Sequence, residues 1–539
     1  MSKRLIVFIS IIAGTILVLI LGALFWWKSH TSGDHIRMIP SDAAFVGVIH
    51  TTEIAQLIDT DLMKESFSKK SSPTPFDAIL SNPMESGIDP LQDVYAFVSD
   101  DAKDGLAALV LNVNSPEKLG ASFKKLGWGE AQKKNDIQYY INESGIVTAW
   151  NEEACLMAVA ANPDEALTAC ETYLVQDEKN SAAVNPEIEK FLDSDAEIGF
   201  ILNNEQTGKI GAMSQISALT LLNPSTGYTS YLFNFEEDEI RLDIFNSNSG
   251  SNDPKTSWLK KTGKKIPFKG IADKEPIAWA GFHADMNALV RELEADDKMS
   301  ANLTMIELGL GLNRNDLIKL MDGSVSVAFT GYEDISKNDP RVQSVQKKLI
   351  EKYAAFQKQF KDFDSTAAAD VAEEFRMVVP VTVMNFGITD ARPVNDLFMK
   401  AGLDKEKDFW VLPGMGMVMY FAAKGNRMII TNSYQAADAF TVNGQLKYDA
   451  PAVMKSNADE EISGWLNADP AKFPSSLMLS MQENLGTQQA AFITDLLQPF
   501  REITLSGNTE KSVIHLKTAP GKGGSLNVVL RHWIKLLAA

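Results

Sequence analysis

The stretch that decides the fold is Leu111-Asn112-Val113-Asn114-Ser115-Pro116-Glu117-Lys118-Leu119, because the chain repeats its pattern. It aligns without a gap, at an offset of 275 (386 − 111), with Phe386-Gly387-Ile388-Thr389-Asp390-Ala391-Arg392-Pro393-Val394. Both copies then run on to a glycine, Gly127 and Gly402. In each copy an apolar stretch ends at a polar cap and a helical stretch closes at that glycine, as a strand followed by a helix requires. One structural unit is therefore expected to occur twice.

Weaker matches follow the same order along both copies. They join Val46-Gly47-Val48-Ile49-His50 to Trp279-Ala280-Gly281-Phe282-His283, Asp93 to Asp322, Glu197-Ile198 to Glu461-Ile462, and Asn234, Glu236, Ile240 and Leu242 to Asn508, Glu510, Ile514 and Leu516. Short turns rich in Gly, Asn and Asp separate the strand-like stretches, which favours antiparallel pairing because parallel neighbours need long crossovers. We therefore expect an α+β fold with two duplicated lobes of antiparallel sheet, in which helices cover one face of each sheet.

The repeat also predicts the domain boundaries. The first α+β lobe covers residues 39–252, a Lys-rich connection covers 253–274, and the second lobe covers 275–539. The second copy holds 46 extra residues between two matched strands (275 − 229), which places an insertion near 332–378. Apolar residues at helical spacing within it indicate an amphipathic helix. That helix either packs on its own lobe or forms an arm that meets a partner or the membrane surface.

A second feature is the run from Leu5 to Trp27, 23 residues without a charged side chain. A helix of that length reaches ~34 Å, which is enough to cross the ~30 Å hydrocarbon core of a bilayer. A cleavable signal peptide is the competing interpretation, but its apolar region is shorter and ends in small residues. The sequence therefore predicts a cytoplasmic tip and transmembrane signal anchor over residues 1–28, and a linker over 29–38. The free amino terminus favours an N-inside orientation.

Composition limits the partners of the exported part. The net charge is −19, and residues 1–28 carry +3, so the remainder carries −22 (−19 − 3). Nucleic acid is excluded as a partner, because its phosphates need clustered Lys and Arg. The membrane is expected as a partner through residues 5–27. An apolar content of 45% is ordinary for a chain that buries globular cores.

The chain lacks the local motifs of common catalytic and cofactor sites. It contains no GxSxG, no GxxxxGK[ST], no HExxH and no Cys/His cluster with zinc-ligand spacing. His50 and His283 end matching strands of the two copies, which raises the hypothesis of a shared site. A polar residue that simply ends a strand before a helix is the plainer interpretation. Catalytic residues are therefore unknown, and no cofactor-binding residue, cofactor or metal ligand is predicted.

Sulfur-containing residues offer two further hypotheses. Met415, Met417 and Met419 alternate, which could hold Cu(I), but alternation is more simply the core face of a strand. Cys155 and Cys170 form either a disulfide or two buried thiols, and the sequence does not choose between these outcomes.

Two segments of the exported part carry a resemblance to a known family. They are Ile39-Pro40-Ser41-Asp42-Ala43-Ala44-Phe45-Val46 and Gly87-Ile88-Asp89-Pro90-Leu91-Gln92-Asp93-Val94-Tyr95-Ala96-Phe97. With the overall length, they resemble a family of uncharacterised bacterial envelope proteins, many of them lipoproteins, known as a domain of unknown function. The resemblance covers residues 38–539 and implies a bacterial envelope location, although this chain lacks the anchor cysteine of the lipoprotein members. It implies no catalytic residues.

Together these features predict a single-pass protein of the bacterial inner membrane whose C-terminal region lies in the periplasm. The expected role is that of a non-enzymatic scaffold or binding module with an envelope protein partner. The alternatives are an extracytoplasmic hydrolase with dispersed acidic catalytic residues, and a carrier of an apolar ligand. Whether the chain is an enzyme is left open, with a preference for a non-enzyme. The ligand, the oligomeric state and the pathway are not determined by the sequence.

Overall fold

The structure is a computed structural model that describes residues 35–59, 86–100, 105–125, 128–207, 226–247, 258–259, 265–295, 314–336, 376–413, 418–457, 460–521 and 523–538. The predicted anchor, residues 5–27, lies outside these ranges, as does most of the predicted insertion. Within the described ranges, no helix combines the length and the apolar character needed to cross a membrane.

Contacts within the chain divide it into two compact units. The first unit holds Met1–Thr256 together with Thr509–Ala539, and the second holds Ser257–Asn508. The C-terminal residues of the second copy of the repeat thus belong to the first compact unit. The limits of the compact units therefore differ from the predicted lobes at this point.

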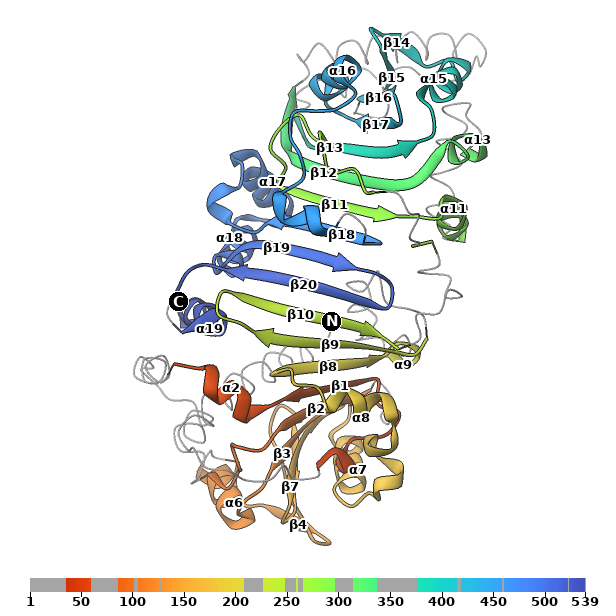
Figure 1. Ribbon diagram of the computed structural model, residues 1–539. Coiled ribbons are helices and arrows are strands. Elements are labelled where there is room, and N and C mark those ends of the chain that lie inside the picture. The colour runs from red at the N-terminus through yellow and green to blue at the C-terminus, as the bar shows by residue number, and fades with distance from the viewer. Residues whose placement is uncertain are drawn as a thin grey trace, which may run out of the picture. The chain divides into compact units, whose positions relative to one another are not determined.

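The first unit is built on an antiparallel sheet in the order β4-β5-β6-β7-β3-β2-β1-β8-β9-β10-β20 (Figure 1). Its strands are β1 (Phe45–Ile49), β2 (Val94–Ser99), β3 (Leu106–Asn112), β4 (Gln132–Lys134), β5 (Ile137–Ile141), β6 (Val147–Trp150), β7 (Ala154–Val159), β8 (Ile198–Asn203), β9 (Tyr228–Phe235), β10 (Glu239–Asn246) and β20 (Lys511–Thr518). Its helices are η1 (His35–Met38), α2 (Thr51–Leu57), α6 (Pro116–Lys125), α7 (Pro163–Tyr173), η2 (Glu178–Asn180), η3 (Ala182–Val184), α8 (Pro186–Leu192), α9 (Asn204–Thr207) and α19 (Gly524–Ala538).

Helices cover both faces of this sheet. Along β7, Leu156 joins a core cluster with residues of α7 and α8, whereas Met157 joins a cluster with residues of α2, α6 and α19. Successive side chains of a strand point to opposite faces, so the two clusters lie on opposite sides of the sheet. The prediction that helices cover one face is therefore wrong. The physical reason is visible in β3, which is apolar at nearly every position and buried along its whole length.

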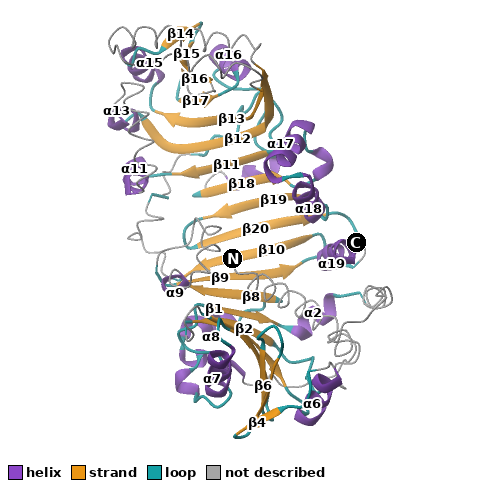
Figure 2. Ribbon diagram, turned by 180° about the vertical axis from the view of Figure 1, so that it is seen from behind, coloured by secondary structure: helices purple, strands orange, loops and turns teal. Residues whose placement is uncertain are grey.

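The helices α2 and α19 meet beside the same strand ends in both views of the first unit (Figures 1 and 2). The Asn527 side chain on α19 accepts a hydrogen bond from the Asp59 amide (2.7 Å) and donates one to the Leu57 carbonyl (2.6 Å). Arg531 of α19 also pairs with the Asp59 carboxylate at 2.5 Å. These contacts fix the end of α2 against the C-terminal helix.

The strands of the second unit pair antiparallel in the order β14-β15-β16-β17-β13-β12-β11-β18-β19. Its strands are β11 (Ala278–His283), β12 (Met321–Ser336), β13 (Arg376–Ile388), β14 (Asp404–Glu406), β15 (Phe409–Pro413), β16 (Val418–Lys424), β17 (Arg427–Thr431), β18 (Ile462–Asn467) and β19 (Phe500–Gly507). Its helices are α11 (Met286–Ala295), α13 (Arg314–Ile318), α15 (Ala391–Lys400), α16 (Tyr434–Asn443), η6 (Ala452–Asn457), η7 (Pro470–Lys472), α17 (Ser475–Leu485) and α18 (Thr487–Leu497).

This sheet, too, is covered on both faces. In β16, Phe421 packs with Phe398 of α15, whereas its neighbour Tyr420 packs in the cluster that holds Phe440 of α16. Met419 packs against the cluster on the α15 side, which agrees with a core role for that methionine. Met415 and Met417 lie outside the described residues.

The two units share one strand order. The first unit runs in the order β4-β5-β6-β7-β3-β2-β1-β8-β9, and the second runs in the order β14-β15-β16-β17-β13-β12-β11-β18-β19. Each strand of the second order takes the place of the strand at the same position in the first. The first and last residues of α6 and α15 are related by the same offset of 275 (391 − 116 and 400 − 125), as the leading match between the copies predicts. The antiparallel α+β class is confirmed in both units.

The ends of the predicted insertion are strands. Ser336 at the end of β12 pairs with Arg376 at the start of β13, so residues 332–336 and 376–378 extend this strand pair. Residues 337–375, where the amphipathic helix is predicted, lie outside the described residues.

The strand that closes the second copy pairs with the strand that closes the first. In the pairing of β10 with β20, Ile240 lies opposite Leu516 and Leu242 lies opposite Ile514. The repeat matches the same four residues in the other combination, Ile240 to Ile514 and Leu242 to Leu516. A strand at a sheet edge offers unpaired backbone groups, and β20 satisfies those of β10.

Candidate functional site

An open, polar part of the first unit's sheet lies on β9, β10 and β20. The pairing places Arg241 of β10 opposite Asn234 of β9 on one side and opposite His515 of β20 on the other. Directly opposite residues in an antiparallel sheet point to the same face, and so do residues two apart along a strand. Asp243 and Lys511 therefore project from the same face as Arg241.

These side chains line a groove of about 510 Å³. Its lining residues come from the segment after α8 and from the three strands: Ser194, Asp195, Ala196, Leu232, Asn234, Arg241, Asp243, Phe245, Lys511, Val513 and His515. The volume falls within the range of about 300–1,000 Å³ that small-ligand sites occupy. All of these residues belong to the first unit.

Asp243 is the centre of the groove's hydrogen-bond network. Its carboxylate accepts hydrogen bonds from Arg241 Nε at 2.9 Å and from Asn234 Nδ2 at 3.3 Å, and Lys511 Nζ lies 4.0 Å away. Its side chain is 13% exposed, whereas those of Arg241 and Lys511 are 39% and 55% exposed. The acid is thus held in place, while the two cations are more exposed to solvent.

Each cation also has a second partner. Arg241 Nη1 donates a hydrogen bond to Glu236 Oε1 at 3.0 Å, and Lys511 Nζ lies 5.0 Å from the centre of the Phe245 ring. At the rim, His515 Nδ1 lies 2.8 Å from Glu239 Oε1. A groove with this alternation of charges suits a partner that offers both acidic and basic groups.

The structure brings some of the residues suggested by the sequence together and keeps others apart. His50 follows β1 and precedes α2, and its Nδ1 lies 2.9 Å from Asp93 Oδ2. Burial of the ring opposes protonation, but the hydrogen bond and charge of Asp93, with Glu53 and Glu197 farther away, outweigh it and raise the pKa of His50. His283 is fully buried at the end of β11, so each of the two histidines lies in a unit of its own.

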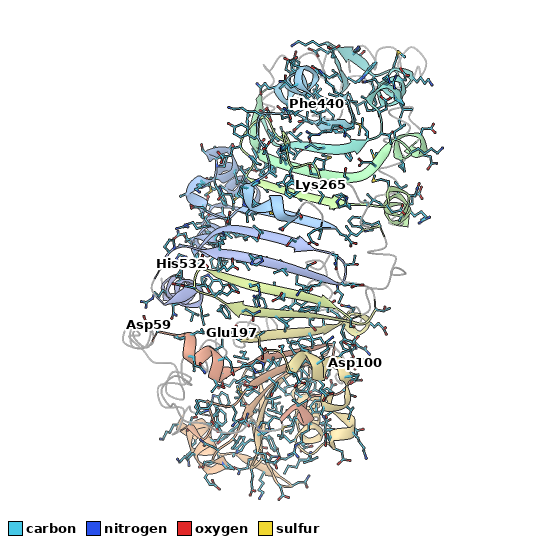
Figure 3. The ribbon with its side chains drawn as sticks, viewed as in Figure 1. Asp59, Asp100, Glu197, Lys265, Phe440 and His532 are labelled. Atoms are coloured by element: carbon cyan, nitrogen blue, oxygen red, sulfur yellow. The ribbon has the colours of Figure 1, made fainter. Side chains whose placement is uncertain are left out.

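The segment around His50 is held by backbone contacts. The His50 amide donates to the carbonyl of Glu197, the residue directly before β8 (Figure 3). Burial raises the pKa of the Glu197 carboxyl, although its Oε2 accepts a hydrogen bond from the Phe235 amide at 3.2 Å. The sequence match between Glu197 and Glu461 holds in the structure, because the His283 amide donates to the Glu461 carbonyl in the same way.

Cys155 and Cys170 are two free, buried thiols. Cys155 lies in the core cluster of α2, α6 and α19, and Cys170 lies in the cluster of α7 and α8. They face different sides of the sheet, so the disulfide alternative is not formed. Burial raises the pKa of both thiols, that of Cys170 to about 12, which keeps them protonated at neutral pH.

Comparison with known proteins gives a family but no activity. Residues 38–290 match an uncharacterised family. Its model is described as Domain of unknown function (DUF4836), which confirms the expected recognition of such a family. No curated protein matches the chain.

Solved structures of crystal forms III, I and IV of TP0453 share 15%, 14% and 11% sequence identity with the chain, at TM-scores of 0.28, 0.26 and 0.24. They cover 41%, 41% and 40% of this chain and 84%, 83% and 81% of their own. Values this low define neither the fold nor the function of the chain.

Sequence reasoning missed the groove. Arg241 and Asp243 lie inside the part of the chain matched by the family model, whereas Lys511 and His515 lie outside it. One signal was available, since charged residues occupy every second position from Glu239 to Asp243 of β10. That alternation indicates a polar strand face, but only the pairing with β20 shows which residues complete it.

Proposed function

We propose that this chain is a membrane-anchored bacterial envelope protein that acts as a non-enzymatic scaffold, and that it docks an envelope protein partner in the groove of the first unit. The observation that carries the proposal is the groove itself, with exposed Arg241 and Lys511 around the fixed carboxylate of Asp243. Such paired charges guide association and select partners of complementary charge more than they add raw affinity.

The anchoring rests on residues 5–27, whose apolar length matches a bilayer. With the amino terminus inside, the C-terminal region lies in the periplasm. A reporter that is active only in the periplasm, fused after Ala539, is expected to be active. Activity of a cytoplasmic reporter at the same position instead would overturn the proposed orientation.

We also infer that the two units descend from one duplicated unit. The shared strand order supports this inference, as does the identical spacing of α6 and α15. The groove includes residues of β20, which closes the second copy, so the docking surface draws on both copies of the repeat.

Site-specific crosslinking in cells tests the docking proposal. Phe245 lines the groove and is 37% exposed, so p-benzoylphenylalanine at this position is a conservative aromatic replacement. Phe492 of α18, which is 52% exposed in the second unit, is the matched control position. We expect position 245 to crosslink to one envelope protein and position 492 to give no such product.

A charge reversal then tests whether the crosslink at position 245 depends on the charges of the groove or arises from chance proximity. Lys511→Glu changes an exposed residue and is expected to remove most of the product at position 245. The proposal fails if the two positions give the same products, or if the position 245 product is unchanged by Lys511→Glu.

A further inference from the structure

A separate cluster of polar side chains lies where β1, α2 and β2 meet. His50, Glu53 and Asp93 each offer one ligand atom, and these atoms all lie within 4.8 Å of one another. Among the residues that the structure describes, this is the group of histidine, cysteine and carboxylate side chains that converges in this way. None of the three lines the groove.

The framework under the cluster is fixed by pairing on two sides. Ile49 lies opposite Val94 in the pairing of β1 with β2, which makes His50 and Asp93 the next opposed pair. Thr51 Oγ1 donates to the Gln92 carbonyl at 3.0 Å, which ties the first residue of α2 to the segment before β2. Glu53 lies three residues after His50, about one helical turn further on, and its exposed side chain is within reach of the other two.

The distances suit a metal ion. His50 Nδ1 and Asp93 Oδ2 are 2.9 Å apart. Two ligand atoms at about 2.1 Å from a tetrahedral ion are about 3.4 Å apart, so small side-chain movements suffice. The side chains of His50 and Asp93 are only 15% and 18% exposed, which limits competition from water.

The charges of the cluster also favour a metal ion. Glu53 and Asp93 bring two carboxylates to one imidazole, and Glu197 adds a third acid close enough to affect the charge on His50. A divalent cation would neutralise this excess of negative charge. Imidazole with carboxylates is a donor set for Zn²⁺ or Mn²⁺, whereas Mg²⁺ and Ca²⁺ prefer oxygen alone.

We infer that His50, Glu53 and Asp93 form a binding site for one divalent transition-metal ion of the Zn²⁺ or Mn²⁺ class at the junction of β1, α2 and β2. In the second unit, the two positions that correspond to Asp93 and Glu53 carry no carboxylate. His283 lies opposite Ser324 in the pairing of β11 with β12. Met286 occupies the position of Glu53, at the same offset of 233 that relates the two histidines (286 − 53 and 283 − 50).

Calorimetric titration of the chelator-treated full-length chain in detergent tests the inference, with Zn²⁺, Mn²⁺ and Mg²⁺ as probes. The wild type is expected to bind one equivalent of Zn²⁺ or Mn²⁺ and to show no comparable affinity for Mg²⁺. Glu53→Gln should weaken binding by about 10-fold or more, since even the loss of an outer-shell partner costs that much. X-ray absorption of the zinc form should show nitrogen and oxygen ligands without sulfur.

The control is Glu205→Gln, which changes an exposed glutamate in the short helix α9 that follows another strand end. Its metal affinity should equal that of the wild type. Because Glu53 is exposed, Glu53→Gln leaves the fold intact and isolates the ligand's contribution. The inference is overturned if the wild type binds neither ion, or if Glu53→Gln and wild type bind the ions equally well.

Discussion

The junction of β1, α2 and β2 in the first unit and the junction of β11, α11 and β12 in the second are built on the same strand order but carry different chemistry. In the first, His50 lies beside Asp93 at 2.9 Å. In the second, His283 lies opposite Ser324, whose amide and hydroxyl both donate to the Asp322 carboxylate. The two junctions share a strand order and differ in the side chains beside the histidine.

The difference corrects one match made from the sequence. Asp93 aligns with Asp322 at an offset of 229 (322 − 93), but strand pairing puts Ser324 in the place of Asp93, at an offset of 231 (324 − 93). The register shift between Met321 and Val325 accounts for the two residues. The second copy therefore holds 44 extra residues between the two matched strands (275 − 231). Asp322 is not the residue that lies opposite His283 in the strand pairing.

The comparison teaches that the two units share their apolar framework and the strand-end histidine, while the residues around that histidine differ. Core residues such as Phe123 and Phe398 keep the common offset of 275 (398 − 123). Polar residues at strand ends are only partly tied to the core, so they can change without altering the pairing. Function is therefore expected to reside in residues that one unit has and the other lacks.

The largest expected effect tests the shared core. Phe123→Ala and Phe398→Ala remove equivalent side chains that are each about 1% exposed. Each should lower the free energy of unfolding by about 3–5 kcal/mol, because a buried phenylalanine leaves a cavity that its neighbours fill only in part. Urea denaturation followed by tryptophan fluorescence measures both.

Comparable costs in the two variants would support one framework in both units. If one phenylalanine could be removed at a cost below about 1 kcal/mol, the two helices would not be equivalent parts of their cores.

A smaller effect is expected from exchanging Asn112 and Gly387, which occupy matching positions of the two copies at the common offset of 275 (387 − 112). Asn112 Nδ2 donates to the Asp93 carbonyl at 3.3 Å, whereas a Cβ at Gly387 would collide with the Asp322 carboxylate and the Ser324 hydroxyl. Gly387→Asn should therefore cost about 1–3 kcal/mol of stability through overpacking. Asn112→Gly should cost about 1 kcal/mol through one lost hydrogen bond and added backbone freedom.

Thermal denaturation of the two single variants checks this order. A Gly387→Asn variant as stable as the wild type would show that the second junction can accept the first unit's side chain. The structural difference between the junctions would then have no steric basis.

The smallest expected effect concerns Glu197, beside the first junction. Its folded-state pKa is raised by burial, so the ionised form opposes folding above that pKa and the penalty disappears as the pH falls through it. Glu197→Gln should therefore raise stability at pH 7 by a few tenths of a kcal/mol, a value reduced by solvent screening. The gain should shrink toward acid pH.

Denaturation midpoints from pH 4 to pH 8 measure the effect, with exposed Glu205→Gln as the control that lacks it. A gain that is constant with pH would assign the effect to packing rather than to charge.

Much of the fold could be predicted from particular residues. The repeated strand–cap–helix pattern around Leu111 and Phe386 gave β3 with α6 and β13 with α15, and the short turns predicted antiparallel pairing. Helix cover on both faces was missed, because a strand such as β3 that is apolar at nearly every position looks the same whether one or two helix layers cover it.

The cluster around His50 and the groove were harder to predict, because both depend on strand pairing. His50 was noticed as the end of a strand, but Asp93 belongs to a different strand segment, and only the pairing of β1 with β2 brings the two together. In the groove, Asp243 and Lys511 are still more widely separated along the chain, since they come from the strands that close the two copies. No local spacing connects such residues, because their proximity arises from long-range pairing.

By itself, the sequence determined the apolar run at residues 5–27, the net negative charge of the rest of the chain, the two copies of one strand and helix order, and the resemblance to an uncharacterised family. These properties are local or periodic along the chain, so they can be found without coordinates. The tertiary structure alone decided that β20 completes the sheet of the first unit, that the cysteines face opposite sides of a sheet, and that His50 meets Asp93. Those outcomes depend on strand register, in which a shift of one residue turns every side chain to the other face.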